Sequence, residues 1–239
     1  MTRPLFFSRA TLKSDPAIEA LAPLLMPADG SAKFQADHRL VWSLFAGDQA
    51  AKRDFLFRRK NPGVNANRAQ FFILSKRPPL TDSALFDVET KRFAPALAAG
   101  DRLGFSLYAN PAVNRIHRIE GRKVTQRHDV VMDALSNIPP AERAERRPDA
   151  IMTAGLAWLE QQGIKAGFAI ADAEQTLKID GYDQFEIGRD GRQRAIRISV
   201  LTFDGFITVN DPETFMRELP EGFGRARAFG CGLMLIRRV

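Results

Sequence analysis

Segments with strand-like and helical patterns of hydrophobic positions alternate through the first half of the chain. Residues 5–12 mix polar and apolar positions around two phenylalanines without helical spacing, which predicts a strand. Residues 15–26 carry apolar side chains at the spacing of one helix face, and residues 38–45 form a second helical piece. We expect further strands at residues 54–58, 70–74, 88–93 and 103–109, with a short helix at residues 81–86.

The second half begins with a basic connector at residues 110–130 and a polar loop, rich in proline, at residues 136–148. Asp149 is then expected to cap a helix that runs to Gln162, with Gly163 as its stop. We predict strands at residues 167–171, 178–187, 194–203 and 206–209, with Asp190 and Gly191 forming a hairpin turn between the second and the third.

One more helix and a final strand complete the second half. Asp211 suits an N-cap, Pro212 suits the first helical position, and Pro220 ends the helix. Both halves therefore follow the order strand, helix, two strands, helix, strand, which is the ferredoxin-like βαββαβ unit. We predict an α+β fold of two ferredoxin-like units in tandem, with an N-terminal domain of residues 1–111 and a C-terminal domain of residues 112–239.

The charge balance adds a preference for polyanionic partners. The 239 residues include 35 Lys and Arg against 28 Asp and Glu, for a net charge of +7 and an isoelectric point of about 9.9. A basic domain of this kind is typical of nucleic-acid binders, because positive charge attracts a phosphate backbone. A basic soluble protein without such a partner would have the same composition, so charge alone does not decide between them.

Several classes of chemistry lack their usual residues. Cys231 is the one cysteine, which excludes an internal disulfide and a cysteine-cluster zinc site, and we expect it to be a small buried residue. The three histidines and the acidic residues show no metal-ligand spacing, and no serine has a GxSxG context, so we expect neither metal nor cofactor. No apolar run reaches the length of a signal peptide or a membrane span, so we expect a cytoplasmic protein without membrane contact.

Four glycines frame two arginines near the end of the chain. Gly222, Gly224, Gly230 and Gly232 would let the backbone approach a phosphate, and Arg225 and Arg227 add positive charge. A dinucleotide loop must open a helix, yet only nine residues follow Gly230, which suits one strand and no helix. The alternative interpretation, a glycine-rich loop that holds the backbone of a longer nucleic acid, is not excluded by this geometry.

His38 is the best candidate for catalysis. RNA carries its own nucleophile, the 2′-hydroxyl, so an enzyme needs to orient it, transfer protons and neutralise the phosphorane. An imidazole suits the proton transfer because its ordinary pKa is near 6.5. His38 begins a helical segment, and Lys52, Arg53 and Arg58 follow soon after it. The alternative is a capping or surface histidine, and His117 and His128 of the connector are interpreted as RNA-facing or solvent-exposed.

Five motifs resemble one known family. They are HRLVWSLF at residues 38–45, RDFLF at 53–57, LYANP at 107–111, FDGFITVND at 203–211 and the glycine pattern at 222–232. In this order they resemble the CasE family, the CRISPR repeat-processing endoribonucleases of type I-E Cascade. The resemblance implies two tandem ferredoxin-like domains and metal-independent cleavage at the base of a repeat hairpin. It also implies a 2′,3′-cyclic phosphate, a 5′-hydroxyl and a product that stays bound in Cascade.

The resemblance places His38 on the catalytic histidine of the family and the four glycines, with Arg225 and Arg227, on its glycine-rich loop. Characterised members often carry a tyrosine three residues before the histidine, where this chain has Gln35. Glutamine does not exchange a proton at neutral pH, so the second proton-transfer group is unassigned.

The expected partners are a CRISPR repeat hairpin RNA and the other Cascade subunits, with a monomer in isolation. Because the major groove of A-form RNA is deep and narrow, we expect recognition of hairpin shape and backbone, with strong salt dependence. Besides the glycine loop, the expected RNA-binding residues are Lys52, Arg53, Arg58, Arg59, Lys60, Arg115, Arg118, Arg122, Lys123, Arg189, Arg192 and Arg194.

Two alternatives remain beside the nuclease. A non-catalytic RNA-hairpin-binding subunit of the same fold would explain Gln35 as a sign of lost cleavage. A small-molecule enzyme that holds a nucleotide on the glycine loop belongs to a different class, and its loop would be protected by a mononucleotide but not by hairpin RNA.

Overall fold

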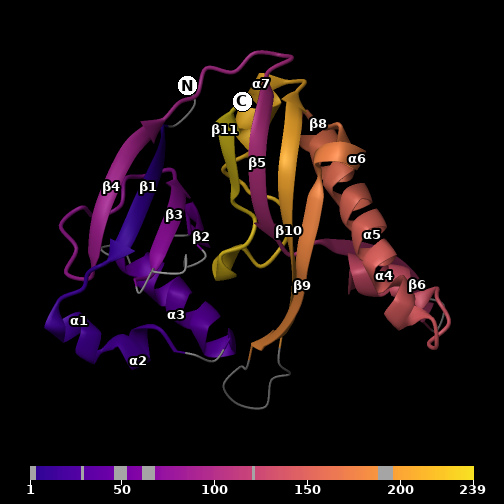
Figure 1. The fold of residues 1–239 in the computed structure, drawn as a ribbon, viewed down its shortest axis with the longest axis horizontal. Coiled ribbons are helices and arrows are strands. Elements are labelled where there is room, and N and C mark those ends of the chain that lie inside the picture. Colours follow the sequence, from indigo (N-terminus) through magenta and orange to yellow (C-terminus); the bar gives the residue numbers. More distant parts are fainter. Residues whose placement is uncertain (1–3, 28–29, 46–52, 61–67, 120–121, 188–195) are drawn as a thin grey trace.

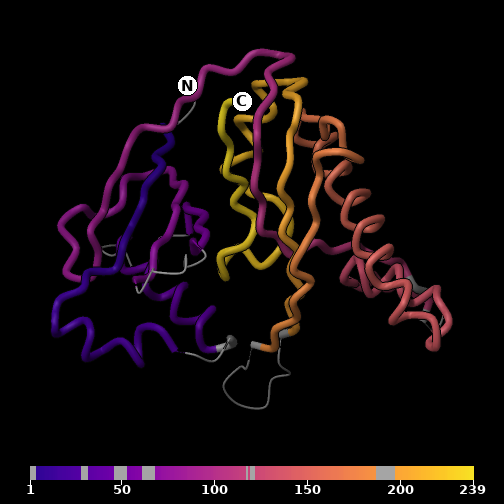
Figure 2. Tube along the Cα trace, viewed as in Figure 1, coloured from indigo at the N-terminus to yellow at the C-terminus, as the bar shows by residue number. Residues whose placement is uncertain are grey.

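Two halves of the chain lie side by side, each built on an antiparallel sheet (Figure 1). The structure is a computed structural model, and it describes residues 4–27, 30–45, 53–60, 68–119, 122–187 and 196–239. The trace crosses from one half to the other between residues 94 and 101, at the end of the molecule that carries the N-terminus (Figure 2). The predicted residues Lys52, Arg189, Arg192 and Arg194, and the turn at residues 190–191, lie outside the described part.

The first half is a four-stranded sheet with its helices on one face. Its strands are β1 (Leu5–Leu12), β2 (Phe55–Arg59), β3 (Gln70–Ser75) and β4 (Phe86–Phe93), in the order β2-β3-β1-β4. The helices α1 (Pro16–Ala20), α2 (Ala22–Leu25) and α3 (Gly30–Ser43) connect β1 to β2. Leu40 and Val41 of α3 pack on Phe57 and Phe71, and so does Leu44 of the turn after the helix. This strand order is that of a ferredoxin-like unit.

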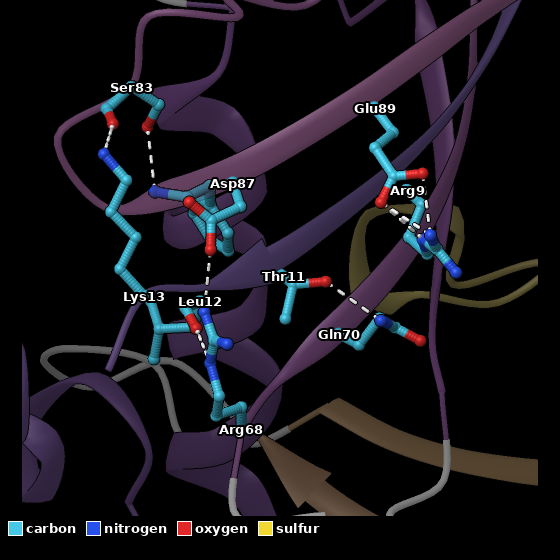
Figure 3. Close-up of polar contacts among 10 residues, drawn as sticks. Arg9, Thr11, Leu12, Lys13, Arg68, Gln70, Ser83, Asp87 and Glu89 are labelled. Carbon is cyan, nitrogen blue, oxygen red and sulfur yellow. Dashed lines mark hydrogen bonds and ion pairs between the residues drawn. The ribbon is translucent and has the colours of Figure 1, made fainter. Parts of the chain in front are cut away.

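Polar contacts between strands also link this sheet (Figure 3). Arg9 of β1 lies opposite Glu89 of β4 and holds both its carboxylate oxygens, at 2.5 and 2.7 Å from Nη2. Gln70 donates to the Thr11 hydroxyl at 2.9 Å across the β1–β3 pair. Such pairs fix the register of neighbouring strands, and with it the face that each side chain occupies.

The second half repeats the same plan with insertions. Its sheet has the order β11-β5-β10-β8, with β9 also paired to β10, from β5 (Arg102–Ala109), β8 (Phe168–Ala171), β9 (Lys178–Ile187), β10 (Ile196–Val209) and β11 (Met234–Arg238). β8 and β9 occupy one sheet edge in succession, because they pair with different parts of β10. Two further strands, β6 (Ala112–Ile119) and β7 (Arg122–Asp129), form a hairpin. The helical elements are α4 (Val130–Ser136), α5 (Arg143–Ala166), α6 (Ala173–Thr176), α7 (Pro212–Glu218) and the 3-10 turn η1 (Arg227–Phe229).

The prediction of an α+β fold with two ferredoxin-like units is confirmed, and a shared core joins them. Leu56 and Leu74 of the first sheet belong to the same buried cluster as Leu107 and Phe203 of the second. β5 pairs with β10 and β11, so the chain changes sheets before residue 102 and not at the expected boundary after residue 111. The break was placed too late because Asn110 and Pro111 end a strand, not a domain.

Three local predictions are wrong for physical reasons. Residues 76–85 form no helix, since the Ser83 hydroxyl accepts from the backbone N–H groups of Leu85 and Phe86 and fixes a turn. α5 begins at Arg143 and contains Pro148, because the Ala, Glu and Arg residues before the proline are strong helix formers. It ends at Gly167, whose φ is 74°, and not at Gly163.

The basic connector at residues 110–130 differs most from its prediction. It forms the hairpin β6–β7, a two-stranded sheet of its own. Six consecutive residues of β7 are exposed, so neither face needs an apolar stripe and the alternation that marks a half-buried strand is missing. Residues 194–203 and 206–209 are likewise one strand, β10, from residue 196. Among the described residues, no helix has the length and apolarity to cross a membrane.

Candidate functional site

His38 lies on α3 where this helix meets the glycine-rich C-terminal loop. Asp37, Leu40 and Val41 occupy the buried face of α3, which leaves the half-buried His38 ring on its flank. The ring centroid is 5.9 Å from that of Trp42, one turn further on, and 6.5 Å from that of Phe229 in η1. Within the described part of the chain, the His38 Nδ1 atom is buried without a hydrogen-bond partner.

The surroundings of His38 favour its neutral form. Burial lowers the pKa of His38, a hydrogen bond with the Ala228 backbone partly offsets this, and the positive charges of Arg53 and Arg39 lower the pKa further. A histidine with a pKa below its ordinary value is unprotonated at neutral pH, and it can accept a proton there.

Two arginines approach the same place from separate segments. Arg53 lies just before β2, and Arg227 lies on η1, which contacts both α3 and β2. Burial and the nearby charge of Arg227 lower the pKa of Arg53, yet a guanidinium stays protonated under ordinary conditions. The structure therefore brings together His38, Arg53 and Arg227, which is a proton acceptor beside two permanent positive charges. An anion between them would relieve the repulsion of the two arginines.

The four loop glycines are explained by packing of the loop on the first sheet, on the second half and on itself. All four have positive φ, between 77° and 90°. A Cβ at Gly222 would lie 2.7 Å from Leu56 Cδ1, and one at Gly230 would lie 3.2 Å from the Phe57 ring. The N–H of Gly232 already donates to the Tyr108 carbonyl at 2.7 Å. The close approach that the sequence indicated is thus made to protein atoms, and contact of these glycines with RNA stays a prediction.

The loop arginines differ in exposure. Arg225 is exposed, and its N–H donates to the Asn110 carbonyl at 3.0 Å. Arg227 is half-buried and donates from Nε to the Gly224 carbonyl at 3.2 Å, which fixes the direction of its side chain. The sequence grouped these two arginines, but only Arg227 adjoins Arg53 in the structure.

The predicted cations of β2 divide between the two faces of the sheet. Arg58 points to the second half, where Nη1 donates to the Ser106 hydroxyl at 2.9 Å, and burial lowers its pKa. Arg59 points to α3 and pairs with Asp37 at 2.5 Å, with its guanidinium 5.7 Å from the Phe71 ring centre. Both side chains therefore have partners within the protein, and their contact with RNA stays a prediction, whereas Lys60 alone of the three is exposed.

Asp37 is the functional candidate that the sequence analysis missed. Burial raises its pKa to about 6, against the opposing effect of Arg59. Its position directly before His38 was the one signal in the sequence, and an aspartate beside arginines in a basic helix is ordinarily solvated. Gln35 lies one turn before His38, and its Oε1 accepts from Arg39 Nη2 at 3.2 Å.

The remaining predicted cations lie on the β6–β7 hairpin, which stands beyond α4 at the other end of the long axis from α3 (Figure 1). Arg118, Arg122 and Lys123 are exposed there, whereas Arg115 pairs with Asp133. The structure thus places Arg53 and Arg227 near His38 and the hairpin cations away from it. Within the described segments, no three His, Cys, Asp or Glu side chains are arranged to hold a metal ion.

Comparison with known proteins gives one consistent family. The model of the family described as CRISPR associated protein matches residues 5–238. The CRISPR system Cascade subunit CasE of Escherichia coli is 27% identical over 203 residues, which cover 82% of this chain and 88% of that protein. The CRISPR-associated endoribonuclease Cse3 of Thermus thermophilus is 29% identical over 152 residues, or 61% of this chain and 60% of Cse3.

Solved structures share the fold. Thermus thermophilus Cse3 bound to an RNA representing a pre-cleavage complex superposes with a TM-score of 0.62 at 21% identity, covering 98% of this chain and 99% of that one. The CRISPR-associated protein Cas6e from Escherichia coli has a TM-score of 0.61 at 21% identity, covering 98% and 100% of the two chains.

Proposed function

The chain belongs to the CRISPR associated protein family, and from that premise we propose that it is an endoribonuclease that cuts CRISPR precursor RNA within its repeat hairpins. The relatives named as a Cascade subunit and as an endoribonuclease support this proposal. The product stays bound to the protein, which thereby becomes a subunit of Cascade.

The convergence of His38, Arg53 and Arg227 is the observation that carries the proposal. Neutral His38 takes the proton from a ribose 2′-hydroxyl, and the oxygen attacks the adjacent phosphorus. A bond from O2′ to phosphorus forms and the bond from phosphorus to O5′ breaks, which leaves a 2′,3′-cyclic phosphate and a 5′-hydroxyl. Arg53 and Arg227 stabilise the additional negative charge of the phosphorane, so we propose cleavage without a metal ion.

The leaving O5′ atom also needs a proton. Gln35 is one turn from His38 but its amide does not donate a proton to an alkoxide at neutral pH. We assign this proton to a water molecule, since His38, Arg53 and Arg227, the described residues that meet at the site, already have other roles.

The β6–β7 hairpin of the protein binds the RNA stem. Arg118, Arg122 and Lys123 are exposed on β6 and β7, where they can contact successive phosphates. Because A-form RNA is read by shape and backbone, the separation between the hairpin and His38 sets which phosphate reaches the site. The summed contacts make affinity fall steeply with salt.

A single-turnover cleavage assay tests the proposal. Hairpin repeat RNA is mixed with excess protein in the presence of a chelator, and wild type is compared with His38→Ala. We expect cleavage by wild type, a loss of about a hundredfold or more in the variant, and similar RNA affinity for both. Equal rates would remove His38 from the mechanism, and binding without cleavage by wild type would favour a non-catalytic hairpin-binding subunit.

A further inference from the structure

The β6–β7 hairpin is a separate element whose direction must be fixed by side chains. It forms a two-stranded sheet that, among the described strands, shares no pairing with either main sheet. It projects beside α4 at one end of the molecule (Figure 1, Figure 2). Exposed faces give it few apolar contacts, and Ile116 is 69% exposed. Polar contacts at the base of the hairpin therefore largely determine its orientation relative to the second sheet.

The first contact joins β6 to α4. Arg115 donates from Nε to both carboxylate oxygens of Asp133, at 3.0 and 3.1 Å, and from Nη2 to Oδ2 at 2.5 Å. The Asp133 side chain is only 15% exposed, so the arginine reaches down to the helix surface. A forked pair of this kind restrains direction as well as distance, which a single ion pair on the surface does not.

The second contact joins the end of β7 to the main sheet. Asp129 Oδ1 accepts from the Met132 N–H at 2.8 Å and caps α4, and it also accepts from the Tyr182 hydroxyl at 2.9 Å. Tyr182 lies on β9. Gln184 in turn donates to the Tyr182 hydroxyl at 3.0 Å. The end of the hairpin, the start of α4 and the edge of the second sheet thus meet at one carboxylate.

We propose that Arg115, Asp133, Asp129 and Tyr182 are positioning residues, which hold the β6–β7 hairpin at the angle required for RNA binding. This inference rests on the proposed function, because it assumes that the hairpin cations contact an RNA stem. It removes Arg115 from the phosphate-binding residues and gives it a role within the protein. The remaining cations of the hairpin reach the correct phosphates only while these contacts hold.

The substitution Asp133→Asn separates positioning from simple charge. It removes a negative charge beside the hairpin, so Coulomb attraction alone predicts tighter RNA binding. Loss of the forked contact predicts the opposite, and we expect the dissociation constant for hairpin repeat RNA to rise about fivefold or more. Glu89→Gln is the matched control, because Glu89 pairs with Arg9 on the first sheet and the charge change is the same. We expect the control to bind like wild type.

Two further variants keep net charge constant. Tyr182→Phe deletes one hydroxyl, and we expect weaker RNA binding together with faster amide hydrogen exchange of β6 and β7 in the free protein. The exchanged pair, Arg115→Asp with Asp133→Arg, restores an ion pair in the reverse direction, and we expect it to bind more tightly than Asp133→Arg alone, although that single variant carries two more units of positive charge.

The outcomes distinguish this inference from the proposed function. If wild type neither binds nor cuts hairpin RNA, the function is wrong, and the exchange measurement still tests the contacts themselves. If wild type binds and cuts but Asp133→Asn binds as tightly or more tightly, the positioning role is overturned. A double variant that binds more weakly than Asp133→Arg would likewise overturn the positioning role, because net charge or a direct phosphate contact of Arg115 would then set the affinity.

Discussion

Arg59 donates a hydrogen bond from Nη1 to Oδ1 of the buried Asp37, at 2.5 Å, and so ties β2 to the helix turn that carries His38. The Asp37 side chain is 8% exposed and that of Arg59 is 21% exposed. Taking two charges out of water is costly, and the attraction between them offsets that cost only while both are present. The pair therefore matters for the position of α3 more than for net stability.

Removal of Arg59 should be much more harmful than neutralisation of Asp37. Arg59→Met leaves a buried carboxylate without this donor, and we expect a loss of about 3 kcal/mol in unfolding free energy at neutral pH. Asp37→Asn keeps an acceptor oxygen for Arg59, so its loss should stay below about 1 kcal/mol. Urea unfolding of both variants measures the difference, and equal losses would contradict the proposed asymmetry.

The unfolding free energy of the protein should also depend on pH through the titration of Asp37. Burial raises the folded pKa of Asp37 to about 6, from 3.8 for the free group. A raised pKa means that the folded state binds the proton more tightly, so this contribution is complete below pH 3.8 and is lost as pH rises through about 6. Relative to Asp37→Asn, wild type should become less stable across that window. A difference that is independent of pH would show that Asp37 is ordinary in the folded state.

The contrast between the confirmed and the wrong predictions has a physical basis. The strands at residues 5–12 and 178–187 were predicted with their observed bounds, because half-buried strands alternate in polarity. The CasE resemblance is confirmed by the family match, since spaced motifs report a shared fold. RNA contact by Arg58 and Arg59 stays a prediction, but the sequence did not indicate their protein partners, because adjacent strand residues point to opposite faces and both faces of β2 are covered. Asp37 was missed because burial depends on contacts distant in sequence.

The rate of RNA cleavage should report the lowered pKa of His38. Its neutral form accepts the proton, so the rate rises with pH through the pKa and then levels off. Because burial lowers that pKa, the midpoint for the free enzyme should lie below the ordinary 6.5. Single-turnover rates at subsaturating protein concentration, measured between about pH 4.5 and 8, give this midpoint. A midpoint above 6.5 would contradict the assignment.

Arg53 should affect both the cleavage rate and the titration of His38. Arg53→Gln removes one of two charges that stabilise the phosphorane, and we expect the single-turnover rate to fall about a hundredfold at saturating protein. The same change removes a positive charge that lowers the pKa of His38, so the midpoint of the pH profile should move upward. Arg225→Gln is the control, since Arg225 is exposed on the same loop and does not adjoin Arg53. A rate loss without any shift in the midpoint would place Arg53 away from the imidazole.

The glycine-rich loop should be more sensitive to an added methyl group than other turns with positive φ. Gly222 has a φ of 77°, and a Cβ there would lie 2.7 Å from Leu56 Cδ1. Gly100 has a φ of 91° with no atom of the described residues within 4 Å of its Cβ position, so Gly100→Ala measures backbone strain alone. We expect Gly222→Ala to cost about 1–3 kcal/mol more than Gly100→Ala in thermal or urea unfolding. Because the loop carries Arg227 to the site, cleavage should slow as well. Equal costs for the two variants would mean that the loop does not need its close packing on β2.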